Sequence, residues 1–297
     1  MRETEKFAVN DFSDWTIEKL PVSGIREKLW LSNPVTGEIG LFKFPRTKYT
    51  GDYWAEKLAY ELGMLASIEI ANTELGIFKG RKGSFSYNIL DDGEYLLEGH
   101  VIIGDILEFS TSTEIYEQLG RSYSVQLLEE VLAERFMLFL KVLVFDCLIG
   151  NTDRHHGNWG FIADDGGNWL RLAPLYDNGS SLCYLERPER IALMEKDQMM
   201  MDAALYTKAK SQIGLNDIRP ADHFSIFAYL CDKYCRSMIP IMDNIKLGIT
   251  DEKISGLLER FHDDTISKRM KEFIIQYLSK RRNRMLDIYR KHHGEEA

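Results

Sequence analysis

"DCLIGNTDRHHGNWGFI", residues 146–162, ends a strongly apolar run in a cluster of Asn, Asp, Arg, His and Gly. A second stretch, "LAPLYDNGSSL" (172–182), follows after a short gap. Four residues separate Asp153 from Asn158 in the first stretch, and the second contains Asp-Asn-Gly beginning at Asp177. Each group alone indicates only a tight turn. Their combination with a preceding apolar helix and an intervening hairpin pattern predicts a catalytic loop.

The spacing from Asp153 to Asn158 is typical of the catalytic loop of protein kinases, where the Asp accepts the proton of the substrate hydroxyl and the Asn binds a metal ion. A further metal-binding Asp follows the next pair of strands, and Asp177 has that place here. ATP phosphates require Mg²⁺, which prefers carboxylate and amide oxygens as ligands. We therefore expect Asp153 to be the base and Asn158 and Asp177 to bind Mg²⁺ together with ATP.

The N-terminal part offers a cation for the phosphates. Lys43 lies in "GLFKFP" on a predicted strand, where kinases carry the Lys that contacts ATP. The helix predicted after it contains Glu56, which we expect to pair with the Lys43 ammonium group. Asp52 and Glu61 are alternative partners on the same helix.

The segment "PVSGIREK", residues 21–28, stands where a phosphate-covering loop is expected, between the first strands. It contains a single Gly, Gly24, rather than the G-x-G-x-x-G pattern. One Gly still lets backbone amides approach phosphate oxygens closely.

Together these motifs resemble the HipA-like Ser/Thr kinases of bacterial toxin-antitoxin systems, in a short form without an added N-terminal subdomain. "SGIREK" is similar to that family's S-G-x-Q-x-K loop, "LIGNTDRHHGN" to its I-G-N-x-D-x-H-x-x-N loop, and "LAPLYDNGSS" to its L-A-P-x-Y-D segment. The resemblance covers residues 20–181. It implies a bilobal kinase fold, ATP with Mg²⁺, transfer to a protein Ser or Thr, and autophosphorylation in the phosphate loop.

The resemblance also assigns roles by position. Ser23 would be the autophosphorylated residue, and His155 would orient the catalytic loop. The nucleotide would be contacted by Ser23, Gly24, Ile25, Lys28, Lys43, Asn158 and Asp177. A translation component as substrate and an antitoxin protein as partner are further implications.

The bulk properties limit the alternatives. The 297-residue chain carries a net charge of −9, which argues against broad nucleic-acid binding. Its four cysteines lack C-x-x-C spacing, so neither a disulfide framework nor a zinc site is predicted. The most apolar stretch covers residues 136–149. It is shorter than a helix that spans a bilayer, which needs about 20 residues. We expect no membrane association and a cytoplasmic protein, with a secreted or translocated effector as the alternative.

Short strand patterns and one helix fill the first ninety or so residues, and helical patterns dominate from residue 124 onward. This order predicts an α+β, bilobal fold, with an N-lobe at residues 1–92 and a C-lobe at 93–297. Two other functions fit the same motifs. One is a kinase for a lipid or small hydroxylated molecule, since the same Asp can deprotonate any hydroxyl. The other is a pseudokinase that acts as a binding module.

Overall fold

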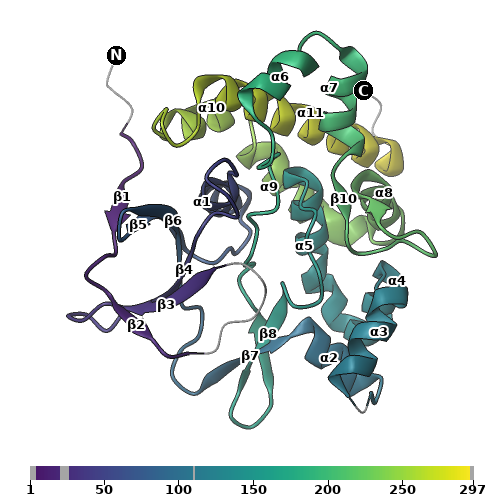
Figure 1. Cartoon of the computed structure of the whole chain (residues 1–297). Coiled ribbons are helices and arrows are strands. Elements are labelled where there is room, and N and C mark those ends of the chain that lie inside the picture. Colours follow the sequence, from purple (N-terminus) through teal and green to yellow (C-terminus); the bar gives the residue numbers. More distant parts are fainter. Residues whose placement is uncertain (1–4, 21–26, 110, 295–297) are drawn as a thin grey trace.

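The computed structural model describes residues 5–20, 27–109 and 111–294. A twisted sheet with one helix forms the N-terminal part, and helices form most of the remainder (Figure 1). The predicted α+β fold is confirmed. The boundary predicted between residues 92 and 93 falls in the turn before β7 (Glu94–Glu98) and stays a prediction.

Six strands build the N-terminal sheet in the order β1-β5-β6-β4-β3-β2. Their bounds are β1 Val9–Asp11, β2 Thr16–Glu18, β3 Lys28–Ser32, β4 Ile39–Lys43, β5 Thr73–Phe78 and β6 Arg81–Tyr87. The β3–β4 turn forms because the Asn33 side chain accepts hydrogen bonds from the backbone N–H groups of Val35 and Thr36. The antiparallel register pairs Lys28 with Lys43, so both side chains lie on one face of the sheet.

The helix α1 (Asp52–Ala66) packs on this sheet through β5 and β6. On the sheet, an aromatic cluster of Phe12, Phe42, Phe78 and Phe85 is buried separately from the main core. The strand period explains the arrangement: Phe42 enters this cluster and its neighbour Lys43 points to the opposite face. Packing of one face thus orients the Lys on the other.

A three-stranded sheet, β7-β8-β9, follows, with β8 at Gly160–Asp164 and β9 at Trp169–Leu172. The predicted hairpin is confirmed as the antiparallel β8–β9 pair. Its turn closes because one Asp164 carboxylate oxygen accepts from the N–H groups of Gly166 and Asn168. This hairpin directly follows the predicted catalytic loop and supports it.

Helices make up most of the rest. They are α2 Gly99–Ile106, α3 Ser112–Ser122, α4 Val125–Leu132, α5 Phe136–Ile149, α6 Pro188–Met194, α7 Gln198–Asp202, α8 His223–Lys233, α9 Cys235–Gly248, α10 Asp251–Glu259 and α11 Lys268–His293. A 3₁₀ turn, Ala133–Arg135, precedes α5, a π-helical turn, Ala203–Thr207, follows α7, and β10 (Lys210–Ser211) pairs with β11 (Ala221–Asp222).

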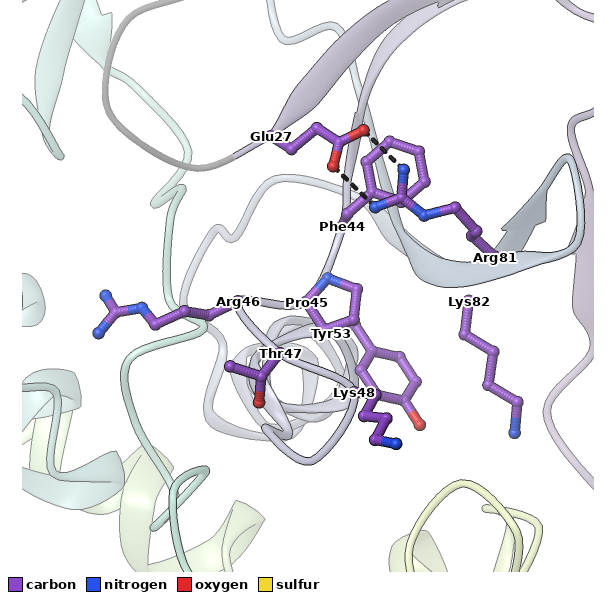
Figure 2. Close-up of a pocket in the computed structure, with 9 residues that line it drawn as sticks. All are labelled: Glu27, Phe44, Pro45, Arg46, Thr47, Lys48, Tyr53, Arg81 and Lys82. Carbon is purple, nitrogen blue, oxygen red and sulfur yellow. Dashed lines mark hydrogen bonds and ion pairs between the residues drawn. The ribbon is translucent and has the colours of Figure 1, made fainter.

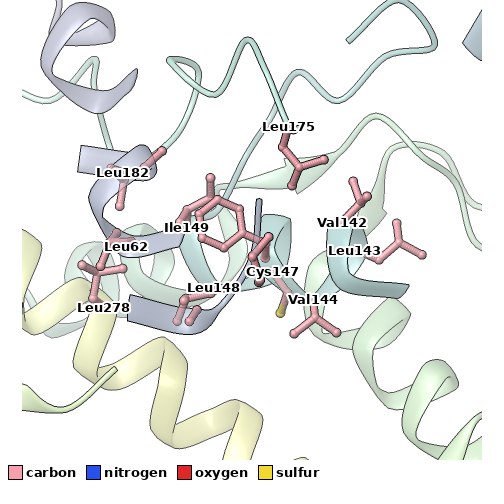
Figure 3. Close-up of a cluster of buried hydrophobic side chains, with 14 of the residues drawn as sticks. Leu62, Val142, Leu143, Val144, Cys147, Leu148, Ile149, Leu175, Leu182 and Leu278 are labelled. Atoms are coloured by element: carbon pink, nitrogen blue, oxygen red, sulfur yellow. The ribbon is translucent and has the colours of Figure 1, made fainter. Parts of the chain in front are cut away.

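The helix α5 is the centre of the main core. Its sequence is apolar on all sides, as a helix surrounded by other elements requires. Leu62 of α1 and Leu278 of α11 lie beside its C-terminal end (Figure 3). Gly150 ends the helix at φ +64°, and a Cβ at this position would come within 1.8 Å of the Tyr277 hydroxyl oxygen. Glycine is therefore required where the chain turns into the predicted catalytic loop.

The turn between α10 and α11 contacts the N-terminal part of the chain. The Phe7 ring packs edge-on against Phe261, and the Phe7 N–H donates to the Arg260 carbonyl. Lys82 of β6 forms an ion pair with Asp264. The cysteines are unpaired thiols, as expected. In the three described ranges, no helix combines the length and apolar character needed to cross a membrane.

Candidate active site

A buried ion pair holds the predicted catalytic loop on α5. Arg154 is fully buried, and its guanidinium donates to both carboxylate oxygens of Asp146, at 2.9 Å each. Asp146 lies in the last turn of α5 and also accepts from the Asn151 side chain. Two parallel hydrogen bonds fix the guanidinium plane, so the loop has one orientation relative to the helix.

The same guanidinium connects the loop to the predicted metal-binding segment. It donates to the carbonyl oxygens of Asn158 and Tyr176 and to the side-chain oxygen of Asn178. Burial by itself lowers the pKa of Arg154. The charge of Asp146 outweighs this effect and raises the pKa of Arg154 above its usual value. One charged side chain thus holds the two segments on which Asp153 and Asp177 lie.

A buried histidine supports the first part of the loop. His223, at the start of α8, has its Nε2 2.9 Å from the Asn151 carbonyl oxygen. Since a carbonyl only accepts, Nε2 carries the proton and donates. Burial, with a smaller effect of the Arg281 charge, lowers the pKa of His223 to about 3, so the ring is neutral.

We expect this histidine to make the fold acid-sensitive. Below the ordinary His pKa of about 6.5 the unfolded chain takes up a proton that the folded chain refuses, so stability falls as pH falls from about 6.5 towards 3. The loss between pH 7 and pH 5 is about 2 kcal/mol for one such group. His223→Gln keeps a donor without this titration, so urea unfolding at both pH values should show a smaller loss. An equal loss in both proteins would contradict the prediction.

The carboxylate of Asp153 is available for chemistry. Its backbone N–H donates to the Asn151 side chain, and its carbonyl accepts from the Asn158 amide group at 2.7 Å. Within the described ranges, the side-chain carboxylate has no hydrogen bond or ion pair. Asn158 is buried, and because its nitrogen is used by the Asp153 carbonyl, its amide oxygen is the atom left to bind a ligand.

The structure brings together Lys43, Glu56 and Asp177. The Lys43 ammonium nitrogen lies 3.1 Å from Glu56 Oε1 and 3.2 Å from Asp177 Oδ1. Burial by itself lowers the pKa of Lys43, but the two carboxylates outweigh it and the pKa is raised, so Lys43 is charged. These residues come from the sheet, from α1 and from the segment after β9.

Glu56 connects α1 to the same segment. Its second oxygen, Oε2, accepts from the Asn178 backbone N–H at 2.9 Å. Of the two alternative partners for Lys43, Asp52 accepts from the Arg46 N–H and Glu61 pairs with Lys57. Glu56 is therefore the carboxylate of α1 that the geometry selects.

A cleft of about 310 Å³ opens beside these groups. It is lined by Lys28 and Lys43 from the sheet and by Asn158 and Asp177 from the C-terminal part. The sequence also places the adenine contacts near residues 87–91, and Tyr87 to Leu90 of this segment line the cleft, whereas Asp91 does not. The predicted phosphate-loop residues Ser23, Gly24 and Ile25 lie outside the described residues.

His155 does not line this cleft. Its Nδ1 accepts a hydrogen bond from the Gly157 N–H at 3.0 Å, inside the catalytic loop. The contact restricts the turn that leads to Asn158. A loop-orienting role agrees with this geometry and stays a prediction.

A larger cavity of about 910 Å³ lies beside β4 and the start of α1 (Figure 2). None of the predicted site residues lines it. The Glu27 carboxylate accepts two hydrogen bonds from Arg81, at 2.6 and 2.7 Å, and the guanidinium lies over the Phe44 ring. Since Glu27 lies near the end of the segment predicted to cover the phosphates, residues 21–28, this pair attaches the end of that segment to β6.

The comparison with protein families agrees with this arrangement. The model of the HipA-like C-terminal domain matches residues 20–238. The chain belongs to this family. The serine/threonine-protein kinase CtkA of Helicobacter pylori is 22% identical over 265 aligned residues, covering 84% of this chain and 78% of CtkA. The crystal structure of the H. pylori proinflammatory kinase CtkA has a TM-score of 0.82 at 19% identity, over 98% of this chain and 99% of that chain.

The fold that this chain shares with CtkA extends through the helical part beyond residue 238. At these identities the structural likeness establishes the fold alone. The roles of Lys43, Glu56, Asp153, Asn158 and Asp177 rest on their geometry and on the motifs.

Our reading of the sequence missed three supporting residues of this HipA-like site: Asp146, Arg154 and His223. A signal for the first existed, because an acid inside a helix that is apolar all round needs a buried cation. Arg154, eight residues on, is the nearest basic side chain after Asp146. His223 gave no such signal, since it lies seventy-two positions after Asn151 in the chain.

Proposed function

We propose that the chain is an ATP- and Mg²⁺-dependent protein Ser/Thr kinase. The observation that carries the proposal is the convergence of Lys43, Glu56 and Asp177 within ion-pair distance, at a cleft that Asn158 also lines. The phosphate-binding Lys of kinases is held by a helix Glu in the same manner. Family membership and the kinase CtkA as a relative support the same activity.

The residues present fit Mg²⁺ and nucleotide phosphates. Asp177 and the Asn158 amide oxygen are hard oxygen donors on one cleft, the ligand type that Mg²⁺ prefers. In the described part of the chain, no group of three or more His, Cys, Asp and Glu is arranged to hold a metal. A site with few protein ligands suits Mg²⁺, because this ion commonly takes waters and substrate phosphates as its other ligands.

The chain's own residues then have separate tasks. Lys43 holds a phosphate oxygen, and Glu56 keeps the Lys43 ammonium in place. Asp153 accepts the proton of the substrate hydroxyl. The hydroxyl oxygen then bonds to the γ-phosphorus, while the bond between that phosphorus and the ADP oxygen breaks. Bound Mg²⁺ would neutralise charge on the phosphates.

Autophosphorylation at Ser23 is part of the proposal. Lys28, the last residue of the predicted loop segment, lines the cleft, and Glu27 before it is bound by Arg81. The described end of the predicted loop segment therefore lies at the edge of the cleft. The antitoxin partner and the substrate from translation follow from the family resemblance alone, and the cytoplasmic location rests on the bulk properties of the sequence.

Incubation with γ-labelled ATP and Mg²⁺ tests the activity. We expect label in protein, on serine or threonine, both in the chain itself and in added lysate proteins. Label that partitions into the organic phase or into small molecules would favour the alternative lipid or metabolite kinase. Thermal stabilisation by ATP and Mg²⁺ without any labelled product would favour a pseudokinase.

Lys43→Met should reduce kcat/KM for ATP on the order of 100-fold, since removal of one preorganised charge contact to the reacting group costs about this much. The exposed Lys280→Met on α11 provides the matched control. Initial rates over a range of ATP concentrations measure the effect. Equal rates for the two variants would contradict the assignment of Lys43 as the residue that contacts the ATP phosphates.

A further inference from the structure

In the sequence, Asp153 stands between residues that line two different cavities. Asn158 lines the nucleotide cleft, whereas Thr152, the residue before Asp153, lines a separate pocket of about 210 Å³. The metal-binding segment runs the same way, with Asp177 on the cleft and residues 180–186 on the pocket. Two segments thus pass from one cavity to the other, and the proposed base lies between them.

The walls of this second pocket are joined by hydrogen bonds. The Thr152 N–H and hydroxyl both donate to the Ser180 carbonyl at 3.0 Å. The Leu182 N–H donates to the carbonyl of Ile149, the last residue of α5. The catalytic loop and the segment after Asp177 therefore form one rigid wall.

Backbone strain is concentrated at the same place. Leu182 and Cys183 are consecutive non-glycine residues with φ of +56°, a left-handed conformation that L-residues avoid. Strained residues of this kind persist where the surrounding structure fixes them, often at sites that clamp a ligand. Here they turn the Cys183 side chain and the following residues around the pocket.

The pocket offers an apolar surface. Ala209 and the buried Tyr277 ring line it, together with Leu185, whose side chain is exposed. Glu186, the acid of the lining, is paired with Lys208 and Arg190, so its charge is compensated. An apolar group that enters the pocket would leave contact with water and pack on these side chains.

We infer that this pocket receives the apolar side chain directly next to the accepted Ser or Thr in a polypeptide substrate. The inference rests on the proposed kinase function and adds the substrate's sequence preference. A cavity of about 150 Å³ accepts benzene, so the 210 Å³ here suffices for a Leu, Ile, Met or Phe side chain. Thr152 and Asp153 are adjacent in the chain, and we therefore assign the occupant to the residue next to the accepted Ser or Thr.

Peptide mixtures test the inference. Each peptide has a central Ser, and each of the twenty residues is placed in turn at the position before or after it. With labelled ATP we expect the wild-type chain to prefer Leu, Ile, Met or Phe over Gly at one of these positions by on the order of 10-fold, since one methylene in an apolar pocket already changes kcat/KM by about 10- to 200-fold.

Ala209→Met should fill the pocket. The preference is then expected to disappear, while use of the Gly peptides and thermal stabilisation by ATP stay near wild type. Ala203→Met is the matched control, because Ala203 lies in the neighbouring π-helical turn, is exposed and does not line this pocket. Thermal unfolding of both variants verifies that they fold.

The results that would contradict the role of the pocket differ from those that would contradict the kinase function. In one outcome, the wild-type chain labels itself or lysate proteins and yet shows no preference beside Ser, or uses none of the peptides. This result overturns the inferred role of the pocket and leaves the proposed kinase function intact. An unchanged preference in Ala209→Met overturns the pocket as well. If the chain labels neither itself, nor lysate protein, nor any peptide, the result contradicts the proposed kinase function and therefore also the inference about the pocket.

Discussion

Asp153→Asn is expected to lose phosphate transfer to protein by a factor on the order of 10²–10⁴, the usual contribution of a positioned general base. Asn has almost the shape of Asp but cannot accept the hydroxyl proton. Within the described residues the Asp153 side chain has no hydrogen bond or ion pair, so the exchange breaks no stabilising contact. ATP binding should persist, because Lys43, Asn158 and Asp177 line the nucleotide cleft and stay in place.

Intact mass after incubation with ATP and Mg²⁺ provides the measurement. The wild type should gain the mass of a phosphate group, mapped by peptide sequencing to Ser23, and Asp153→Asn should not. Asp165→Asn, an exposed carboxylate in the β8–β9 turn, is the matched control and should behave as wild type. Equal phosphorylation of Asp153→Asn and wild type would sink the assignment of Asp153 as the base.

Arg154→Met should have the largest effect on stability. It leaves the buried Asp146 carboxylate without its cation and three oxygen acceptors, two of them backbone carbonyls, without their donor. Breaking a buried pair from one side costs about 3–5 kcal/mol. Urea unfolding at pH 7 should show this loss, and activity should fall with it, because the same guanidinium joins the loop of Asp153 to the segment of Asp177.

Arg171→Met provides the comparison. Arg171 makes a two-point contact with Glu94 on the edge of the small sheet, but its side chain is 40% exposed. Exposed ion pairs contribute about 0–1 kcal/mol, so this change should be nearly silent. Similar losses for Arg154→Met and Arg171→Met would mean that burial does not decide the effect.

Local sequence predicted much of this molecule. The apolar run of α5, the Asp-Asp-Gly-Gly turn of the β8–β9 hairpin and the two-residue period around Lys43 depend on neighbours in the chain, so their patterns were visible without a fold. The pairing of Lys43 with Glu56 was also predicted, because a strand and the next helix pack in a regular manner. The distance of 3.1 Å between them agrees with that expectation.

Contacts between distant segments could not be read in this way. His223 donates to Asn151 across seventy-two positions, and Tyr277 of α11 requires Gly at position 150. Such partners depend on how the C-terminal helices pack against α5, and no local pattern records that packing. The second pocket likewise combines the catalytic loop, residues 180–186 and α11, which are far apart in the chain.

The sequence by itself therefore determined the motif residues, their order and the carboxylate or amide type of Asp153, Asn158 and Asp177, because side-chain type and spacing are written in the chain. Only the tertiary structure decided which groups hold them in place. Burial of the Arg154–Asp146 pair removes water from that contact, so a single guanidinium can fix two segments, and burial is a property of the packed fold.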